Sequence, residues 1–105
     1  MREISPKRTS LESIIEEALN TLNIYYIPQF PTRTGFIIDY AIPDKKIALE
    51  IDGPYHDTKE QKKRDSFKDY MLKREGWQVM RIHWTKIEGK SVKEIAKMIK
   101  DAIQL

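Results

Sequence analysis

The sequence predicts an α/β (α+β) fold with a mixed four-stranded sheet flanked by helices, in the order α-β-β-β-α-β-α. Three observations support this prediction. Apolar residues recur at helical spacing near both ends of the chain, three strand-like runs follow one another, and a charged helical segment precedes a fourth run. A chain of 105 residues can bury one modest core. We therefore expect residues 1–105 to form a single domain.

Helices are expected over three segments, at about residues 10–22, 58–75 and from 92 onward. The apolar positions of the first segment share one face: Leu11, Ile14, Ile15, Ala18, Leu19 and Leu22. Thr9 or Ser10 can cap its N-terminus, and Ser91 can cap the last helix. Gly76 is expected to end the middle helix as its C′ residue. That helix is expected to turn three residues inward: Phe67, Tyr70 and Met71.

Strands are expected over four runs rich in β-branched and aromatic residues: 24–30, 36–42, 47–51 and 77–84. Pro28 suggests that the first run is an edge strand, because proline lacks the amide that a central strand needs. The first three strands follow one another directly, which implies antiparallel pairing. The helix before the fourth strand implies a parallel join. The strand order is not fixed by the sequence.

Composition excludes several classes of protein. The chain has no cysteine, so it has no disulfide framework, thiolate zinc site or cysteine nucleophile. No apolar run approaches the roughly 20 residues that cross a bilayer, and we identify no signal peptide. We expect a cytoplasmic protein without a membrane partner. The net charge of +3 permits a polyanionic partner without requiring one.

Three carboxylates occupy positions where strands rarely carry them. Asp39 interrupts an apolar run, and Glu50 and Asp52 end the next one. Alternation puts Glu50 and Asp52 on one face, and pairing of the two strands would bring Asp39 to it. Such a group repels itself unless a cation neutralises it, which favours Mg²⁺ or Mn²⁺ bound to oxygen. The Ile51 carbonyl, at the end of the strand, is a candidate for a further ligand.

A structural interpretation of these carboxylates remains open. Acidic residues at strand ends often face solvent or pair with a lysine, and Lys45 and Lys46 are near.

Two further residues are candidates for catalysis. His56 lies four residues beyond Asp52, where an imidazole could remove a proton from water, with Asp57 or Asp65 to orient it. Glu12 lies at the rim of the apolar face of the first helix and could look into a cleft beside the sheet. The alternatives are an incidental loop histidine and a carboxylate that offsets the helix dipole.

Basic residues are concentrated in the middle helix: Lys59, Lys62, Lys63, Arg64, Lys68, Lys73 and Arg74. Such a surface can follow a phosphate backbone, although interspersed acidic residues also fit a solvated face. Arg81, His83 and Trp84 on the fourth strand could contact substrate or serve packing.

These motifs together resemble a known family. They are similar to a very-short-patch-repair-type endonuclease domain with an E-D-x-H-D site. The similarity lies in Asp39 and in three segments: 47–56 (IALEIDGPYH), 63–65 (KRD) and 76–84 (GWQVMRIHW). That group belongs to the PD-(D/E)XK superfamily and includes the catalytic domain of phage homing endonucleases. The resemblance covers nearly the whole chain. It implies a restriction-endonuclease-like core.

The resemblance also implies roles for single residues. Asp39 would be the principal metal ligand, with Glu50 and the Ile51 carbonyl beside it. His56 would be the general base, Asp65 its partner or the final acid of the set, and Glu12 the acid of the first helix. Asp52 stands where the broad pattern has lysine, which favours the histidine variant and leaves open whether Asp52 is a ligand.

We therefore expect a Mg²⁺-dependent endonuclease that acts on double-stranded DNA, with Mn²⁺ as a possible substitute and Lys59, Lys62, Lys63, Arg64 and Arg81 as DNA contacts. It would act in the cytoplasm or, if phage-encoded, in the bacterial cytoplasm. No recognition module is evident, so a fragment of a longer protein is one interpretation of the chain. A non-catalytic DNA-binding module and a junction-resolving nuclease are the alternatives. Target sequence, nicking or double-strand cutting, number of metal ions and oligomeric state are not fixed.

Overall fold

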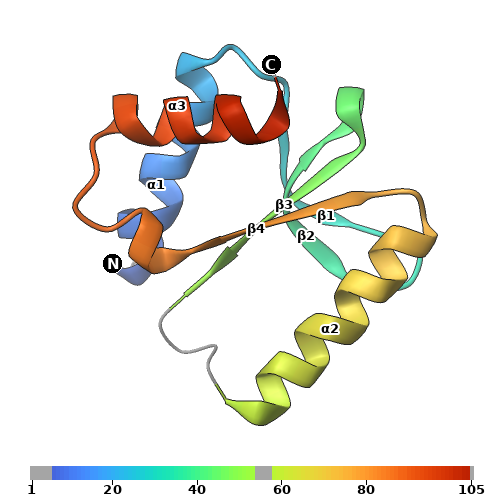
Figure 1. Ribbon diagram of the computed structural model, residues 1–105. Helices are drawn as coiled ribbons and strands as arrows, with labels where there is room; N and C mark the ends of the chain where they lie inside the picture. The colour runs from blue at the N-terminus through green and yellow to red at the C-terminus, as the bar shows by residue number, and fades with distance from the viewer. Residues whose placement is uncertain (1–5, 54–57, 105) are drawn as a thin grey trace, which may run out of the picture. The chain divides into compact units, whose positions relative to one another are not determined.

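The computed structural model describes residues 6–53 and 58–104 (Figure 1). The predicted element order is confirmed: α1 (Pro6–Thr21), β1 (Ile27–Pro31), β2 (Ile37–Ile42), β3 (Ile47–Asp52), α2 (Lys59–Arg74), β4 (Gln78–His83) and α3 (Val92–Ile103). Two short 3₁₀ turns, η1 (Pro43–Lys45) and η2 (Trp84–Lys86), were not predicted. Thr9 and Ser10 lie inside α1, so the prediction that one of them caps this helix is wrong. No helix in the described ranges is long and apolar enough to cross a membrane.

The chain divides into two compact units, of which the first contains α1 and α3. These two helices pack against each other, and Ile15 and Leu19 of α1 are fully buried. Ser91 caps α3 as predicted, because its side chain accepts from the Glu94 amide while the Glu94 carboxylate accepts from the Ser91 amide. This reciprocal cap fixes where α3 begins.

The second unit, from Tyr25 to Trp84, contains the four-stranded sheet and α2. The strands lie in the order β1-β2-β3-β4. β1, β2 and β3 are antiparallel, and β4 joins β3 in parallel after the crossover through α2, as predicted. β1 is an edge strand, which confirms the interpretation of Pro28. The carboxyl ends of β3 and β4 therefore lie side by side, with Asp52 paired to His83.

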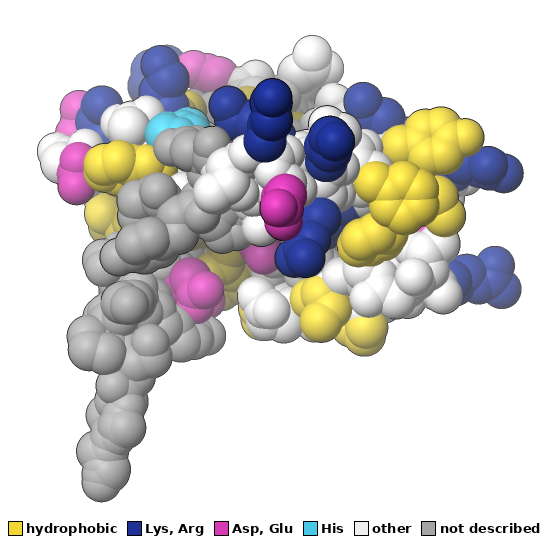
Figure 2. All heavy atoms as spheres, turned by 90° about the horizontal axis from the view of Figure 1, so that it is seen from below, with side chains coloured by type: hydrophobic (Ala, Val, Ile, Leu, Met, Phe, Trp, Pro, Cys, Tyr) yellow, Lys and Arg dark blue, Asp and Glu magenta, His cyan; other side chains and the backbone are white. Residues whose placement is uncertain are grey.

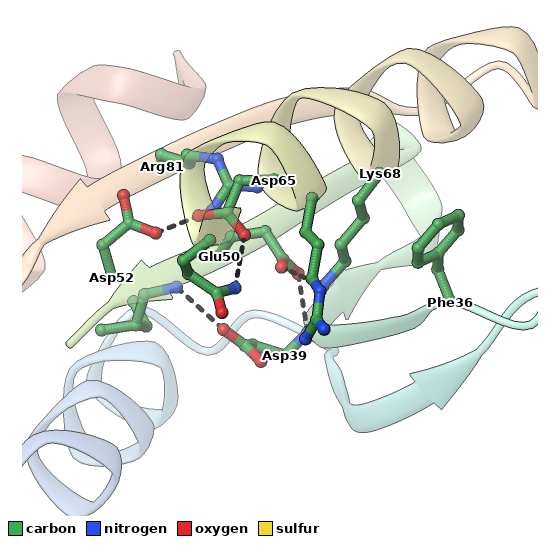
Figure 3. Close-up of a pocket in the computed structure, with 10 residues that line it drawn as sticks. Phe36, Asp39, Glu50, Asp52, Asp65, Lys68 and Arg81 are labelled. Carbon is green, nitrogen blue, oxygen red and sulfur yellow. Dashed lines mark hydrogen bonds and ion pairs between the residues drawn. The ribbon is translucent and has the colours of Figure 1, made fainter. Parts of the chain in front are cut away.

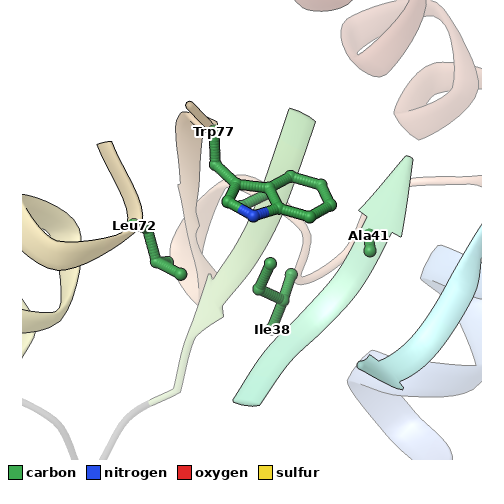
Figure 4. Close-up of a cluster of buried hydrophobic side chains, with 5 residues drawn as sticks. Ile38, Ala41, Leu72 and Trp77 are labelled. Atoms are coloured by element: carbon green, nitrogen blue, oxygen red, sulfur yellow. The ribbon is translucent and has the colours of Figure 1, made fainter. Parts of the chain in front are cut away.

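A hydrophobic cluster joins α2 to one face of the sheet (Figure 4): Ile38, Ala41, Ala48, Leu72 and Trp77, with Ile27, Phe30 and Val79 packed against it. The end of α2 supports this cluster. The Trp77 amide donates to the Leu72 carbonyl and the Gly76 amide to the Lys73 carbonyl, both at 3.0 Å, and Gly76 has φ +93°. This is the Schellman arrangement, so the C′ role of Gly76 is confirmed.

The predicted inward stripe of α2 is wrong at Phe67 and Tyr70, whereas Met71 is half-buried. Phe67 and Tyr70 are 57% and 55% exposed, and Leu72 is the buried residue of the helix. The side of α2 that meets the sheet carries Leu72 together with polar residues spaced three and four apart along the helix: Gln61, Asp65 and Lys68. An inward face of this kind is invisible to a search for apolar periodicity.

Candidate active site

Asp39 and Glu50 meet where the main-chain pairing of β2 and β3 ends. That pairing runs from Ile42 with Ile47 to Tyr40 with Leu49. Beyond it, the Asp39 amide donates to Glu50 Oε2 at 2.8 Å, and the Ile51 amide donates to Asp39 Oδ2 at 2.9 Å. Each carboxylate therefore replaces a main-chain acceptor of the neighbouring strand. These bonds hold both side chains in fixed positions.

The backbone is irregular at the level of Asp39. Ile38 and Ala41 pack in the same cluster although they are three residues apart, whereas regular strands place such residues on opposite faces. On β1, Gln29 lies between the partners of Tyr40 and Ile38 and has φ +52°, in the left-handed region. Such a conformation is uncommon for a residue other than glycine, and irregular backbone is concentrated at functional sites. The irregularity lies beside the carboxylate pair.

Glu50 is the one buried charged side chain among the residues whose exposure the structure describes, at 3%. Its burial raises its pKa, and the nearby charge of Asp39 raises it further. Lys68 opposes both effects because its Nζ donates to Glu50 Oε1. No local feature of the sequence indicates this partner, because Lys68 follows Glu50 by 18 residues and is one of several cations in the same helix.

A pocket of about 240 Å³ opens at this pair (Figure 3). A water molecule takes up roughly 30 Å³ of liquid, so the pocket has room for a hydrated cation with a phosphate group. Its lining mixes carboxylates with cations: Phe36, Asp39, Glu50, Ile51, Asp52, Gln61, Arg64, Asp65, Lys68 and Arg81. Asp65 is held by Gln61, whose Nε2 donates to Oδ1 at 3.2 Å.

Arg81 forms a second charged group at the rim of the pocket. Its Nε and Nη2 donate to the two oxygens of Asp69 at 3.2 and 2.6 Å, and its Nη1 donates to Asp52 at 2.7 Å. Burial alone would lower the pKa of Arg81, but its hydrogen bonds to Asp69 and the charges of Asp69 and Asp52 raise it overall. This group links α2 and β4 to the end of β3.

Comparison with known proteins decides the family. Residues 11–102 match the model of a restriction-endonuclease-like family described as REase_MTES_1575. The chain belongs to this family. A similar fold occurs in a solved structure named "Homing Endonuclease I-Bth0305I Catalytic Domain". The two share 21% identity over 85% of this chain and 88% of that chain, with a TM-score of 0.67. No curated protein matches the chain.

The structure of this restriction-endonuclease-like chain brings together most of the predicted pocket residues. Asp39, Glu50, Ile51, Asp52 and Asp65 all line the pocket. Among the predicted DNA contacts, Arg64 and Arg81 also line it, whereas the remaining three are exposed on α2: Lys59, Lys62 and Lys63. Figure 2, seen from below, shows Lys and Arg side chains spread around a few carboxylates.

Two predicted catalytic residues are not part of the described pocket. His56 lies outside the described residues, together with Asp57. Glu12 lies on α1, in the helical unit, and is partly buried. Both roles stay predictions.

The suggested pairing of the carboxylates with Lys45 or Lys46 is wrong. Lys46 Nζ lies 4.5 Å from the centre of the Trp77 ring, and Lys45 is exposed. The cations that pair with Glu50 and Asp52 are Lys68 and Arg81. Both come from distant parts of the sequence.

The donor set fits a hard divalent cation with few protein ligands. Within residues 6–53 and 58–104, no group of three or more His, Asp and Glu side chains is gathered closely enough to hold a metal ion. Mg²⁺, however, commonly takes one or two carboxylates and completes its shell with water and substrate phosphate. Asp39 uses only Oδ2 for the Ile51 amide, and no described residue donates to its other oxygen. Asp39 and Glu50, with the Ile51 carbonyl, are the groups that could hold such an ion.

Proposed function

We propose that this domain is a Mg²⁺-dependent DNA endonuclease that hydrolyses phosphodiester bonds at the Asp39–Glu50 pocket. The observation that carries the proposal is the pair of carboxylates fixed at the end of the β2–β3 pairing, one of them buried, beside cations that can receive a phosphate. Family membership and the fold shared with a homing endonuclease catalytic domain support it. A very-short-patch-repair-type site is the finer form of the proposal.

Each described group has a definite task in this proposal. Asp39 and Glu50 would hold Mg²⁺, which when bound supplies positive charge for the phosphate and acidifies nearby water. The Ile51 and Asp39 amides keep the two carboxylates in position. Arg64, which lines the pocket, can bind the phosphate oxygens of the substrate. These groups orient the phosphate before reaction.

The remaining predicted residues complete the proposal. His56 would act as the general base, and Asp65, which Gln61 holds at the pocket, would orient it. Exposed Lys59, Lys62 and Lys63 on α2 would follow the backbone of double-stranded DNA. Glu12 stays a further catalytic candidate.

Cleavage of plasmid and linear duplex DNA in Mg²⁺ or Mn²⁺ tests the proposal, with EDTA as the metal-free control. We expect EDTA-sensitive cleavage that Asp39→Asn abolishes, because the variant keeps the side-chain shape without its charge. Asp44→Asn is the matched control, since Asp44 is an exposed carboxylate on η1. Equal cleavage by the parent and Asp39→Asn, or cleavage that survives EDTA, would contradict the proposal. A four-way junction included among the substrates tests the junction-resolving alternative.

A non-catalytic DNA-binding module is the second candidate. It is favoured by one observation, namely that Glu50 and Asp52 already have cationic partners within the chain. Calorimetric titration with Mn²⁺ separates the candidates. A nuclease should bind the ion with an affinity that Asp39→Asn reduces, whereas a binding module should give no heat above dilution while still binding DNA.

A further inference from the structure

Lys68 occupies the side of Glu50 that faces the pocket. Its Nζ donates to Glu50 Oε1, while Oε2 accepts from the Asp39 amide. The two side chains are 17% and 3% exposed, so little water screens their charges. The lysine reaches this position from α2 (Figure 3). Its ammonium thus lies at the oxygen of Glu50 that a pocket cation would use.

The charges at this point do not balance. Asp39 and Glu50 contribute two carboxylates, and Lys68 is the one cation that pairs with either of them in the described part of the chain. The two carboxylates belong to neighbouring positions of paired strands, because the Asp39 amide donates to Glu50 Oε2 at 2.8 Å. Two carboxylates and one ammonium leave a net charge of −1 at this point. A bound divalent cation would change this net charge to +1, with the lysine still protonated. One phosphodiester carries the charge that would neutralise this surplus.

We propose that Lys68 is an exchangeable counter-ion of Glu50: a divalent cation displaces its ammonium, which then binds a phosphate of the substrate. The proposal rests on the proposed function, because it requires a divalent ion at Asp39 and Glu50. Lysine suits the task, since its ammonium is a point charge on a flexible stem and leaves one partner for another at small geometric cost. Metal and phosphate binding are thereby coupled through one side chain.

Metal affinity tests the exchange. In calorimetric Mn²⁺ titrations at pH 8.5, we expect Lys68→Met to bind Mn²⁺ at least about fivefold more tightly than the parent, because no ammonium competes for Glu50. The alkaline pH keeps protons from taking the place of the lost cation. Lys68→Arg keeps the competing charge and should bind Mn²⁺ no more tightly than the parent. Lys63→Met removes an exposed lysine of the same helix and controls for the loss of one positive charge.

The possible outcomes distinguish a failure of the proposed metal site from a failure of the lysine exchange. If the parent binds no Mn²⁺, the metal site of the proposed function fails, and the exchange fails with it. If the parent binds Mn²⁺ and Lys68→Met binds it equally or more weakly, the exchange alone is overturned. Tighter binding by Lys68→Met, with Lys63→Met unchanged, supports it.

A measurement on the unaltered chain covers the case in which Lys68→Met does not fold. The ¹⁵N-labelled ammonium of Lys68 should give a distinct NMR signal, because its ion pair slows exchange with water. Titration with diamagnetic Mg²⁺ should shift or broaden this signal and leave that of exposed Lys63 unchanged. A Lys68 signal that stays constant while Mg²⁺ saturates the site would overturn the proposal.

DNA binding tests the second half of the exchange. Measured by fluorescence anisotropy, Lys68→Met should weaken duplex binding several-fold in Ca²⁺, where the ammonium is free to bind phosphate. In EDTA the same change should have less than about a twofold effect, since Lys68 is then committed to Glu50. Lys63→Met should weaken binding equally in both conditions. Equal effects of Lys68→Met with and without Ca²⁺ would contradict the transfer to phosphate.

Discussion

Two charged groups join α2 to the same side of the sheet, and they differ in how fully their charges are paired. The pocket pair, Glu50 and Lys68, is held by one ion-paired hydrogen bond, and a second carboxylate, Asp39, lies beside it. The Arg81 bridge, formed by Arg81 with Asp69 and Asp52, contains three hydrogen bonds. Glu50 is 3% exposed, whereas the two aspartates of the bridge are 26% and 22% exposed. The pocket pair is therefore more deeply desolvated and less well paired.

The difference indicates which group holds the fold and which is available for a ligand. The guanidinium of Arg81 presents a rigid fork that matches Asp69, and such bidentate pairs give geometric specificity. The pocket pair offers one point charge to a buried carboxylate whose pKa burial raises. Burial without full pairing is costly in a folded protein and is typical of sites that receive a further partner.

The sharpest way to test this contrast is Glu50→Gln. We expect the Mg²⁺-dependent cleavage rate to fall by roughly a thousandfold, because loss of a metal ligand removes several kcal/mol of charge stabilisation. The free energy of unfolding should change by less than about 1 kcal/mol, because the neutral side chain has no buried charge to desolvate. This gain offsets the loss of the Lys68 ion pair, and the amide oxygen still accepts from the Asp39 amide. Single-turnover cleavage and urea unfolding measure the two effects. Exposed Glu60 on α2 gives the control Glu60→Gln, and equal losses in the two variants would contradict the role of Glu50.

The opposite pattern is expected for Arg81→Met. Removal of the guanidinium leaves Asp69 and Asp52 without their partner, so the free energy of unfolding should fall by about 2 kcal/mol, less than for a fully buried pair. Mn²⁺ affinity, measured by calorimetry, should stay within about threefold of the parent. The control is Arg74→Met, because the Arg74 side chain is exposed and donates to the Tyr70 hydroxyl at 3.4 Å. A stability loss no larger than in Arg74→Met would show that the bridge does not hold the fold.

The sequence predicted the elements well because their periodicities are local. Short, mostly apolar runs over 36–42 and 47–51 indicate two strands, and the short connection between them implies that they pair. The meeting of Asp39 with Glu50 follows from that pairing. The sequence pattern does not predict the irregular backbone at Asp39 and Gln29, because this irregularity depends on contacts with the neighbouring strands.

The charged partners were missed for a different reason. Lys68 and Arg81 lie 18 and 29 residues from Glu50 and Asp52, so nothing local indicates which carboxylate each will meet. Phe67 and Tyr70 were expected inside because apolar residues usually are, yet the sheet beneath α2 carries carboxylates. A polar inward face on the helix is the complement of that sheet surface.

Asp52 is a predicted metal ligand on sequence grounds, whereas the structure pairs it with Arg81. We expect Asp52→Asn to cost about 1 kcal/mol or less of unfolding free energy, since its amide oxygen can still accept from Arg81. Mn²⁺ affinity should change less than about twofold if Asp52 belongs to the bridge. A tenfold loss of affinity, which corresponds to about 1.4 kcal/mol, would instead return Asp52 to the ligand set. Calorimetry and urea unfolding on the same preparation give both values.

The smallest effect is expected from an exposed cation that belongs to neither group. Lys63→Gln should weaken duplex binding by a similar factor for unrelated DNA sequences and reduce the slope of log affinity against log salt by about 0.9, as expected for one lost phosphate contact. The matched control is Lys93→Gln, since Lys93 is an exposed lysine on α3. Fluorescence anisotropy at several salt concentrations measures the slopes. If both lysines reduce the slope equally, binding reflects net charge alone, and α2 has no special part in it. If only Lys63→Gln reduces the slope, α2 contacts the DNA backbone. The DNA then lies next to the pocket, because Asp65 and Lys68 of the same helix line it.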